Sequence, residues 1–133
     1  MRLLGVVAIV LNILWLIADL FIIFSQAVKS NGLLVCSGQI GTNPDHSVPQ
    51  NAEEEFRNAW QSVGIVLKEA GLDFGDIIEY TSFHVNLSEN IQAFMKTRDE
   101  VISEPWPAWT AIGITELAVP GARVEIRVIA QIR

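Results

Sequence analysis

The spacing of apolar residues along the chain predicts two of its elements directly. Within residues 51–70, apolar side chains recur every three or four positions, which predicts an amphipathic helix. Within residues 122–132, apolar and polar residues alternate, which predicts a strand with one buried face. On that strand, Glu125 and Arg127 are expected to point away from the core.

Local signals mark the ends of the two predicted helices. Asn51, followed three residues later by Glu54, resembles a capping box, and Gly71 is well placed to end the first helix. A second helix is predicted after Ser88, its expected N-cap, because apolar residues again recur at helical spacing. The residues of this second helical segment that are expected to face inward are Ile91, Phe94, Met95, Val101 and Ile102.

The remaining β-prone runs complete a ββαβαββ order. These runs are residues 25–29, 33–37, 76–86 and 110–115. The order predicts an α+β fold in which two helices cover one face of a mostly antiparallel sheet. On the strand at residues 76–86, Ile77, Phe83 and Val85 are expected to share one face. Ile78 and Tyr80, together with Trp106 and Trp109, are expected on the uncovered face, which other copies of the chain would cover in a closed homo-oligomer.

The stretch at residues 104–117, EPWPAWTAIGITEL, leads into a strand as a stiff arm. Pro105 and Pro107 each fix their own φ and push the preceding residue into extended geometry. Trp106 and Trp109 on such an arm suggest a binding or subunit-contact surface. A second interpretation, that the two tryptophans close the end of a core, stays open.

The N-terminal residues differ in composition from the rest of the chain. The apolar run at residues 3–24, interrupted by Gly5, Asn12 and Asp19, is long enough to cross a bilayer as a helix. Three interpretations compete: a membrane anchor, a secretory signal, or a misassigned start ahead of a domain at residues 24–133. The run abuts the first strand without a linker, which favours the third. Flanking charge does not decide among them.

Charge and cysteine content narrow the classes of function. The net charge is −6 and there is no basic cluster, which argues against nucleic acid as a partner. Cys36 is the single cysteine, so no intrachain disulfide can form, which fits a reducing compartment. His46 and His84 have no zinc-like spacing to Cys36 or Asp45, so no metal site is expected.

Several short motifs stand in a fixed order along residues 24–133. They are Ser25-Gln26-Ala27-Val28, Val35-Cys36-Ser37-Gly38-Gln39-Ile40, Ala70-Gly71-Leu72 with Asp76-Ile77-Ile78, Pro107-Ala108, and Val124-Glu125-Ile126 before Ile129-Ala130. Each motif is weak alone. Their order and spacing together resemble the Rid family, also called the YjgF-like or reactive intermediate deaminase family.

The resemblance implies a chorismate-mutase-like protomer that forms a homotrimer with clefts between neighbouring subunits. In the deaminase members, the cleft hydrolyses reactive enamines and imines to 2-keto acids and ammonia, with no metal or organic cofactor. An arginine holds the substrate carboxylate, and a glutamate positions the attacking water. The expected partners are therefore a small metabolite and further copies of the chain. The expected location is the cytoplasm, with membrane attachment through residues 3–24 as the alternative.

Family residues can be carried over position by position. The glutamate matches Glu125, and the family's Ser-Gly pair matches Ser37 and Gly38. The tyrosine that precedes the first strand falls on Phe24, which keeps the ring and loses the hydroxyl. The arginine that follows Pro-Ala is replaced by Trp109. The resemblance is therefore closer to the YjgH-like branch, whose members lack this arginine.

The exchange of arginine for Trp109 changes the chemistry of the expected cleft. A guanidinium grips a carboxylate through two parallel hydrogen bonds, whereas an indole offers a flat apolar surface and one N–H donor. Trp109 is therefore expected to form a wall of the cleft, with Ala111 and Arg127 as further substrate-binding candidates. Arg123 and Arg127 flank Glu125 and either pair with it or belong to a surface charge ladder.

Three functions stay open at this point. The first is a homotrimer that binds a small metabolite and lacks standard 2-imino-acid deaminase activity, with Glu125 and Ser37 as the polar groups of the cleft. The second is a cofactor-free imine or enamine hydrolase that acts on a bulkier or uncharged substrate. The third is a trimeric interaction module without catalysis, in which Trp106 and Trp109 pack the interface.

Overall fold

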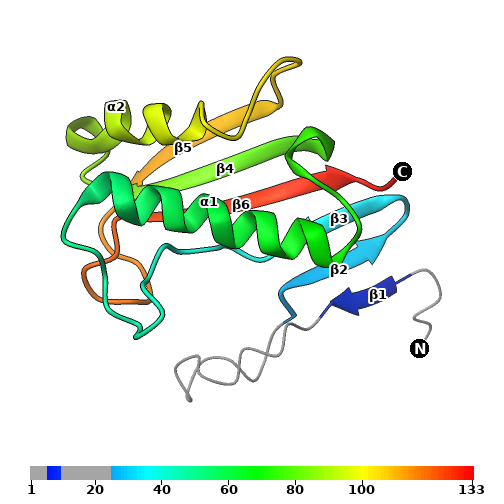
Figure 1. The fold of residues 1–133 in the computed structure, drawn as a ribbon, viewed down its shortest axis with the longest axis horizontal. Helices are drawn as coiled ribbons and strands as arrows, with labels where there is room; N and C mark the ends of the chain where they lie inside the picture. The colour runs from blue at the N-terminus through cyan, green and yellow to red at the C-terminus, as the bar shows by residue number, and fades with distance from the viewer. Residues whose placement is uncertain (1–5, 10–24) are drawn as a thin grey trace.

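In the computed structural model, which describes residues 6–9 and 25–133, six strands form one sheet and two α-helices lie across one of its faces (Figure 1). The order across the sheet is β1 (Val6–Ile9), β2 (Ala27–Ser30), β3 (Leu33–Cys36), β6 (Val124–Gln131), β4 (Ile77–Val85) and β5 (Ala108–Ile114). Neighbouring strands run antiparallel, except that β5 runs parallel to β4. Because a tight turn cannot join parallel strands, the chain crosses between them through α2 (Leu87–Arg98). The predicted α+β fold is confirmed.

Helix α1 (Ala52–Glu69) begins and ends where the sequence predicts. The side chain of Asn51 accepts a hydrogen bond from the backbone N–H of Glu54 at 3.0 Å. Acidic residues fill the first turn, where the helix dipole favours negative charge. Gly71, with φ of 76°, adopts the left-handed conformation that commonly ends helices. Local sequence signals therefore account for both ends of α1.

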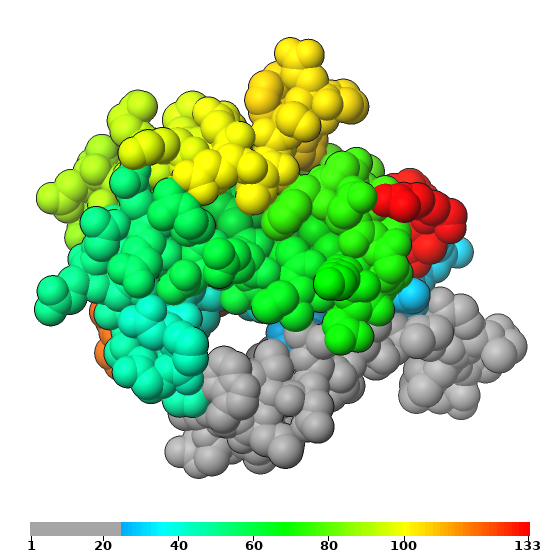
Figure 2. Space-filling model, viewed as in Figure 1, coloured from blue at the N-terminus to red at the C-terminus, as the bar shows by residue number. Residues whose placement is uncertain are grey.

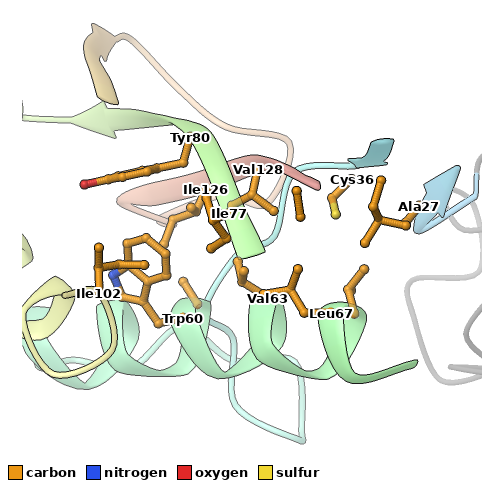
Figure 3. Close-up of a cluster of buried hydrophobic side chains, with 14 of the residues drawn as sticks. Ala27, Cys36, Trp60, Val63, Leu67, Ile77, Tyr80, Ile102, Ile126 and Val128 are labelled. Atoms are coloured by element: carbon orange, nitrogen blue, oxygen red, sulfur yellow. The ribbon is translucent and has the colours of Figure 1, made fainter. Parts of the chain in front are cut away.

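The hydrophobic core lies between α1 and the centre of the sheet (Figure 3). Trp60, Val63 and Leu67 point from α1 toward the sheet, where Ile126 and Val128 of β6 meet them. Every second residue of β6 is buried, so the alternation predicted for this strand is confirmed. The same alternation places the intervening polar residues of β6 on the face that no helix covers.

Strand β4 contains an irregularity that reverses part of the predicted pattern. Its register against β6 shifts between Ile77 and Glu79, as in a β-bulge. Beyond the shift, Tyr80 faces the helices and is 3% exposed, while Ile78 is 45% exposed. The expectation that Tyr80 lies with Ile78 on the uncovered face is therefore wrong. The extra residue also places Phe83 on the face opposite to Ile77, so the predicted shared face is wrong as well.

Helix α2 begins at Leu87, one residue before the expected N-cap Ser88. Asn86 takes the cap position with φ of 57°, a left-handed conformation that asparagine tolerates better than most residues. A single residue, Asn86, therefore links β4 to α2. Phe94 is fully buried as expected, and Thr97 is also buried, where its hydroxyl donates a hydrogen bond to the Phe94 carbonyl.

Strand β1 lies within the apolar N-terminal run. It pairs antiparallel with β2, with Val6 opposite Ser30 and Ile9 opposite Ala27. A continuous helix over residues 3–24 is therefore wrong at the four residues of β1, because their backbone groups pair with the edge of β2 instead. Residues 3–5 and 10–24, on which the rest of that prediction falls, lie outside the described residues. Within the described part of the chain, no helix is long and apolar enough to span a bilayer.

A buried carboxylate ties the start of β6 to the first turn of α1. Glu55 is fully buried and accepts hydrogen bonds from the backbone N–H groups of Arg123 at 2.6 Å and Val124 at 3.3 Å. It also pairs with the Arg123 guanidinium at 2.6 Å. The same guanidinium donates to the carbonyls of Pro49 and Gln50, the last residues of the loop before Asn51 and α1. Three segments of backbone therefore depend on one ion pair.

We expect Glu55→Gln to lower the free energy of unfolding by about 3 kcal/mol, because a buried ion pair that loses one partner leaves the other charge uncompensated. Glu53→Gln is a matched control, since Glu53 occupies the same helical turn and pairs with Lys96 at the surface. That control is expected to cost less than about 1 kcal/mol. Urea unfolding of both variants measures the difference, and equal losses would contradict the role given to Glu55.

Candidate functional site

Two of the predicted site residues, Glu125 and Gly38, lie in direct contact on the uncovered face. A Cβ atom built on Gly38 would lie 2.5 Å from the carboxyl carbon and Oε2 of Glu125, so the carboxylate rests on the glycine backbone. Backbone hydrogen bonds of 2.8 Å in both directions between Gln39 and Ile126 hold the two segments at this spacing. A larger residue at position 38 would therefore displace the carboxylate.

The Glu125 carboxylate is partly shielded from water and has no partner in the described part of the chain. It is half-buried, and among the described residues no hydrogen bond or ion pair reaches its carboxylate. Burial raises the pKa of Glu125 above its ordinary value. A carboxylate that is partly removed from water and lacks a protein partner can accept a proton or orient a water molecule.

The serine of the predicted site has a structural hydrogen bond. The Ser37 hydroxyl donates to the carbonyl of Ser25 at 2.6 Å, which joins the end of β3 to the segment before β2. Next to it, the buried side chain of Gln39 donates to that of Gln26 at 2.9 Å. The Ser37 oxygen can still accept a hydrogen bond from a ligand. Phe24, the expected ring of the cleft, lies outside the described residues.

Trp109 lies on the face of the sheet that the helices cover, so the expectation that it lies on the uncovered face is wrong. In the parallel pairing of β4 with β5, Trp109 stands beside Tyr80 and Ala111 beside Ser82, both on the side that the helices cover. The Trp109 ring stacks on Tyr80 with ring centres 5.7 Å apart, and its Nε1–H donates to the Ser82 hydroxyl at 2.8 Å. It also contacts Phe94 of α2. The indole is therefore held by packing and by one hydrogen bond.

The predicted residues thus form two groups that one chain does not bring together. Glu125 and Gly38 lie on the uncovered face, and Trp109 and Ala111 lie beneath α2. Arg127 shares the face of Glu125, stands opposite Thr81 and is exposed.

Of the two arginines that flank Glu125 in sequence, Arg123 binds Glu55 and does not pair with Glu125. Arg127 has no ion pair with any described residue. The local charge on Glu125 is therefore not balanced by either neighbour.

Sequence reasoning missed Arg98, at the end of α2. The carbon at the centre of its guanidinium lies 5.2 Å from the ring centre of Trp109 and 5.5 Å from that of Trp106. Its Nε and Nη2 groups donate to Asp99 at 2.9 and 2.6 Å. The arm that carries Trp106 projects from the surface beside α2, as the gold segment in Figure 2 shows. The sequence signal for this contact was an arginine in the last turn of α2, shortly before an arm that carries two tryptophans.

A buried histidine continues the hydrogen-bond chain from Trp109. His84 Nε2 lies 2.8 Å from the Ser82 hydroxyl, which also accepts the Trp109 N–H. His84 Nδ1 is buried without a partner. Burial lowers the pKa of His84 to about 4, so the ring is neutral near pH 7. The described residues contain no cluster of three or more His, Cys, Asp or Glu that could hold a metal ion.

Three comparisons place the chain among known proteins. The sequence model of one family, described as Endoribonuclease L-PSP, matches residues 21–132. The RutC family protein YjgH of Escherichia coli is 38% identical over 110 residues, which cover 82% of both chains. A 2-iminobutanoate/2-iminopropanoate deaminase of Mus musculus is 32% identical over 80% of this chain and 79% of its own. A solved structure of protein YjgH superposes with a TM-score of 0.76 at 37% identity, over 82% of this chain and 83% of that one.

The pKa of His84 leads to a prediction for stability at acid pH. The unfolded chain takes up a proton on this ring below about pH 6.5, while the folded chain resists it until about pH 4. Stability from the neutral ring is therefore complete above pH 6.5 and is lost as the pH falls toward 4, by about 3 kcal/mol. Denaturant unfolding of His84→Gln across this range is expected to show a shallower loss than wild type. Parallel curves would show that His84 does not titrate as predicted.

Proposed function

Since the chain belongs to the Endoribonuclease L-PSP family, which includes the YjgF- and RidA-type proteins, we propose that it forms a homotrimer and binds a small metabolite in clefts between neighbouring subunits. The observation that carries this proposal is the half-buried Glu125 carboxylate, which rests on Gly38 without a protein partner. Burying a polar group without a partner costs free energy, so a ligand or an ordered water is the expected partner.

The uncovered face supports assembly. Val35 and Ile112 are 36% and 40% exposed there, and Phe83 and Ile129 are half-buried beside them. Strand β5 is also an edge of the described sheet, with one side unpaired. Apolar faces and open strand edges favour a partner, and identical copies in a closed ring supply one.

The placement of the two groups of residues supports a cleft between subunits. Glu125 and Trp109 lie on opposite faces of the same sheet. A neighbouring copy that packs its edge strand against the uncovered face would bring the Trp109 side of one chain toward the Glu125 side of another. Under this proposal each cleft takes residues from two chains, and the monomer alone is not active.

The chemistry proposed for the cleft needs no cofactor. The mouse relative is named for the deamination of 2-iminobutanoate and 2-iminopropanoate. By resemblance, this chain lacks the arginine that would hold such a carboxylate, and Trp109 stands in its place. We therefore propose weak or absent turnover of these substrates. The raised pKa of Glu125 supports an alternative, namely hydrolysis of a bulkier or uncharged imine with Glu125 orienting the water.

The net charge supports a ligand other than nucleic acid, and the free cysteine supports the proposed location. The net charge of −6 argues against RNA as the ligand, although the family description names an endoribonuclease. Cys36 is a buried free thiol whose pKa is raised to about 12 by burial, so it is unreactive. A free thiol of this kind fits the reducing cytoplasm, which is the proposed location.

Assembly is tested by placing a charge on the uncovered face. Sedimentation of the wild type is expected to give three times the 14.7 kDa mass of one chain. Ile112→Lys should shift the protein toward monomer, because a buried unpaired lysine at an interface is costly. Ile65→Lys is the control: Ile65 is also exposed but lies on the outer side of α1, so the trimer is expected to persist. A monomeric wild type would contradict the proposal.

The role of Glu125 is tested with two variants that act through the same contact. Glu125→Gln removes the basic group, and Gly38→Ala displaces the carboxylate by the Cβ contact described above. Both are expected to lower the hydrolysis of an uncharged imine, the substrate class proposed for Glu125, by about 10²-fold while the protein stays folded. Glu79→Gln, an exposed carboxylate of β4, is the control and should leave the rate unchanged. Unchanged turnover and ligand binding in Glu125→Gln would favour the interaction module without catalysis.

A further inference from the structure

We propose that Arg98 binds the anionic group of the ligand, so that the cation of the site comes from α2 and not from β5. The inference rests on the proposed function and names its ligand class as small carboxylates. It starts from the contact of one guanidinium with two indole rings, Trp109 at 5.2 Å and Trp106 at 5.5 Å. These are the distances at which a cation is attracted to the face of an aromatic ring.

The stack holds the guanidinium in a defined position. Trp109 is itself fixed by its hydrogen bond to Ser82 and by stacking on Tyr80. Trp106 is 57% exposed, so the second ring lies at the surface of the projecting arm. A guanidinium whose position is already fixed loses less conformational entropy when it binds an anion.

The hydrogen bonds of Arg98 leave donors for a ligand. Its Nε and Nη2 groups donate to Asp99, and a further hydrogen bond joins it to Tyr80. A guanidinium carries five N–H donors in one plane, so part of this fork stays unused. The Arg98 side chain is 14% exposed, which combines partial shielding from water with access from the surface. Planar, charged donors in such a position suit a carboxylate.

No other described arginine rests on two aromatic rings, and Arg127, which has no ion pair with a described residue, is exposed without such support. Arg57 forms a two-pronged pair with Glu100, and Arg133 pairs with Asp73 and Asp76 at the surface. Arg98 also pairs with an acid, Asp99, but its fixed partners include two aromatic faces, which attract a cation without adding a negative charge.

The geometry also couples positions 98 and 109. An arginine at position 109 would place a second guanidinium close to that of Arg98 and would remove the indole on which Arg98 rests. Trp109→Arg alone is therefore expected to weaken carboxylate binding. A ligand carboxylate bound by Arg98 would lie nearer α2 than one bound by an arginine on β5. The ligand's reacting group would then lie differently relative to Glu125, so tight binding does not require fast hydrolysis.

The test compares a ligand that has a carboxylate with one that lacks it. Wild type is titrated with 2-oxobutanoate and with the uncharged 2-butanone, followed by NMR. Arg98→Met should weaken binding of 2-oxobutanoate by about 10- to 100-fold and leave 2-butanone unchanged, because one charge-assisted hydrogen-bonding group is lost. Arg98→Lys, which keeps the charge without the planar guanidinium, should bind 2-oxobutanoate with an affinity between those of wild type and Arg98→Met. Arg57→Met, which also removes an arginine paired with an acid, is the control and should bind as wild type does.

The outcomes separate this inference from the proposed function. If Arg98→Met binds 2-oxobutanoate as tightly as wild type while Glu125→Gln does not, the cleft proposal stands and the role of Arg98 is wrong. If wild type binds 2-oxobutanoate no better than 2-butanone, the carboxylate class is wrong and so is the inference. Circular dichroism of each variant confirms that a loss of binding does not come from unfolding.

Discussion

The buried ion pair between Glu55 and Arg123 is the constraint on which the rest of the structure depends. It fixes the first turn of α1 against the start of β6 and holds the loop that precedes α1 through backbone carbonyls. The chain also passes so close to α1 at Gly41 that a Cβ there would collide with the Glu55 carbonyl oxygen. Because Glu125 follows Arg123 by two residues, the same anchor sets the position of the candidate catalytic group.

The alternation along β6 then determines which face of the sheet each candidate site residue of this strand occupies. Core residues such as Ile126 must face α1, so Glu125 faces the side without helices. In contrast, the pairing of β5 with β4 turns Trp109 toward α2. One chain therefore places the two groups of predicted site residues on opposite faces of one sheet. The second chain in the proposed assembly is needed because side chains alternate between the two faces of a strand.

Much of the fold could be predicted because local sequence determines it. The period of α1, its Asn51 cap and the alternation of β6 need no information from distant residues. The bulge in β4 could not be predicted, since it depends on how β4 pairs with a strand far along the chain, and it moved Tyr80 from one face to the other. The left-handed cap at Asn86 depends on the same long-range pairing, because it follows from where β4 ends.

For the site, sequence identified Glu125, Gly38 and Trp109 as separate residues but not their surroundings. The contact of Gly38 with Glu125 and that of Arg98 with Trp109 arise only when distant segments pack together. These contacts change how Trp109 is understood. By resemblance, Trp109 stands where an arginine is expected, which would leave the strand without a cation. As a ring beneath Arg98, it supports a cation from the helix. Under the proposal for Arg98, the cation that binds the ligand comes from α2, and the ligand's carboxylate and Glu125 need not be aligned as an arginine on β5 would align them.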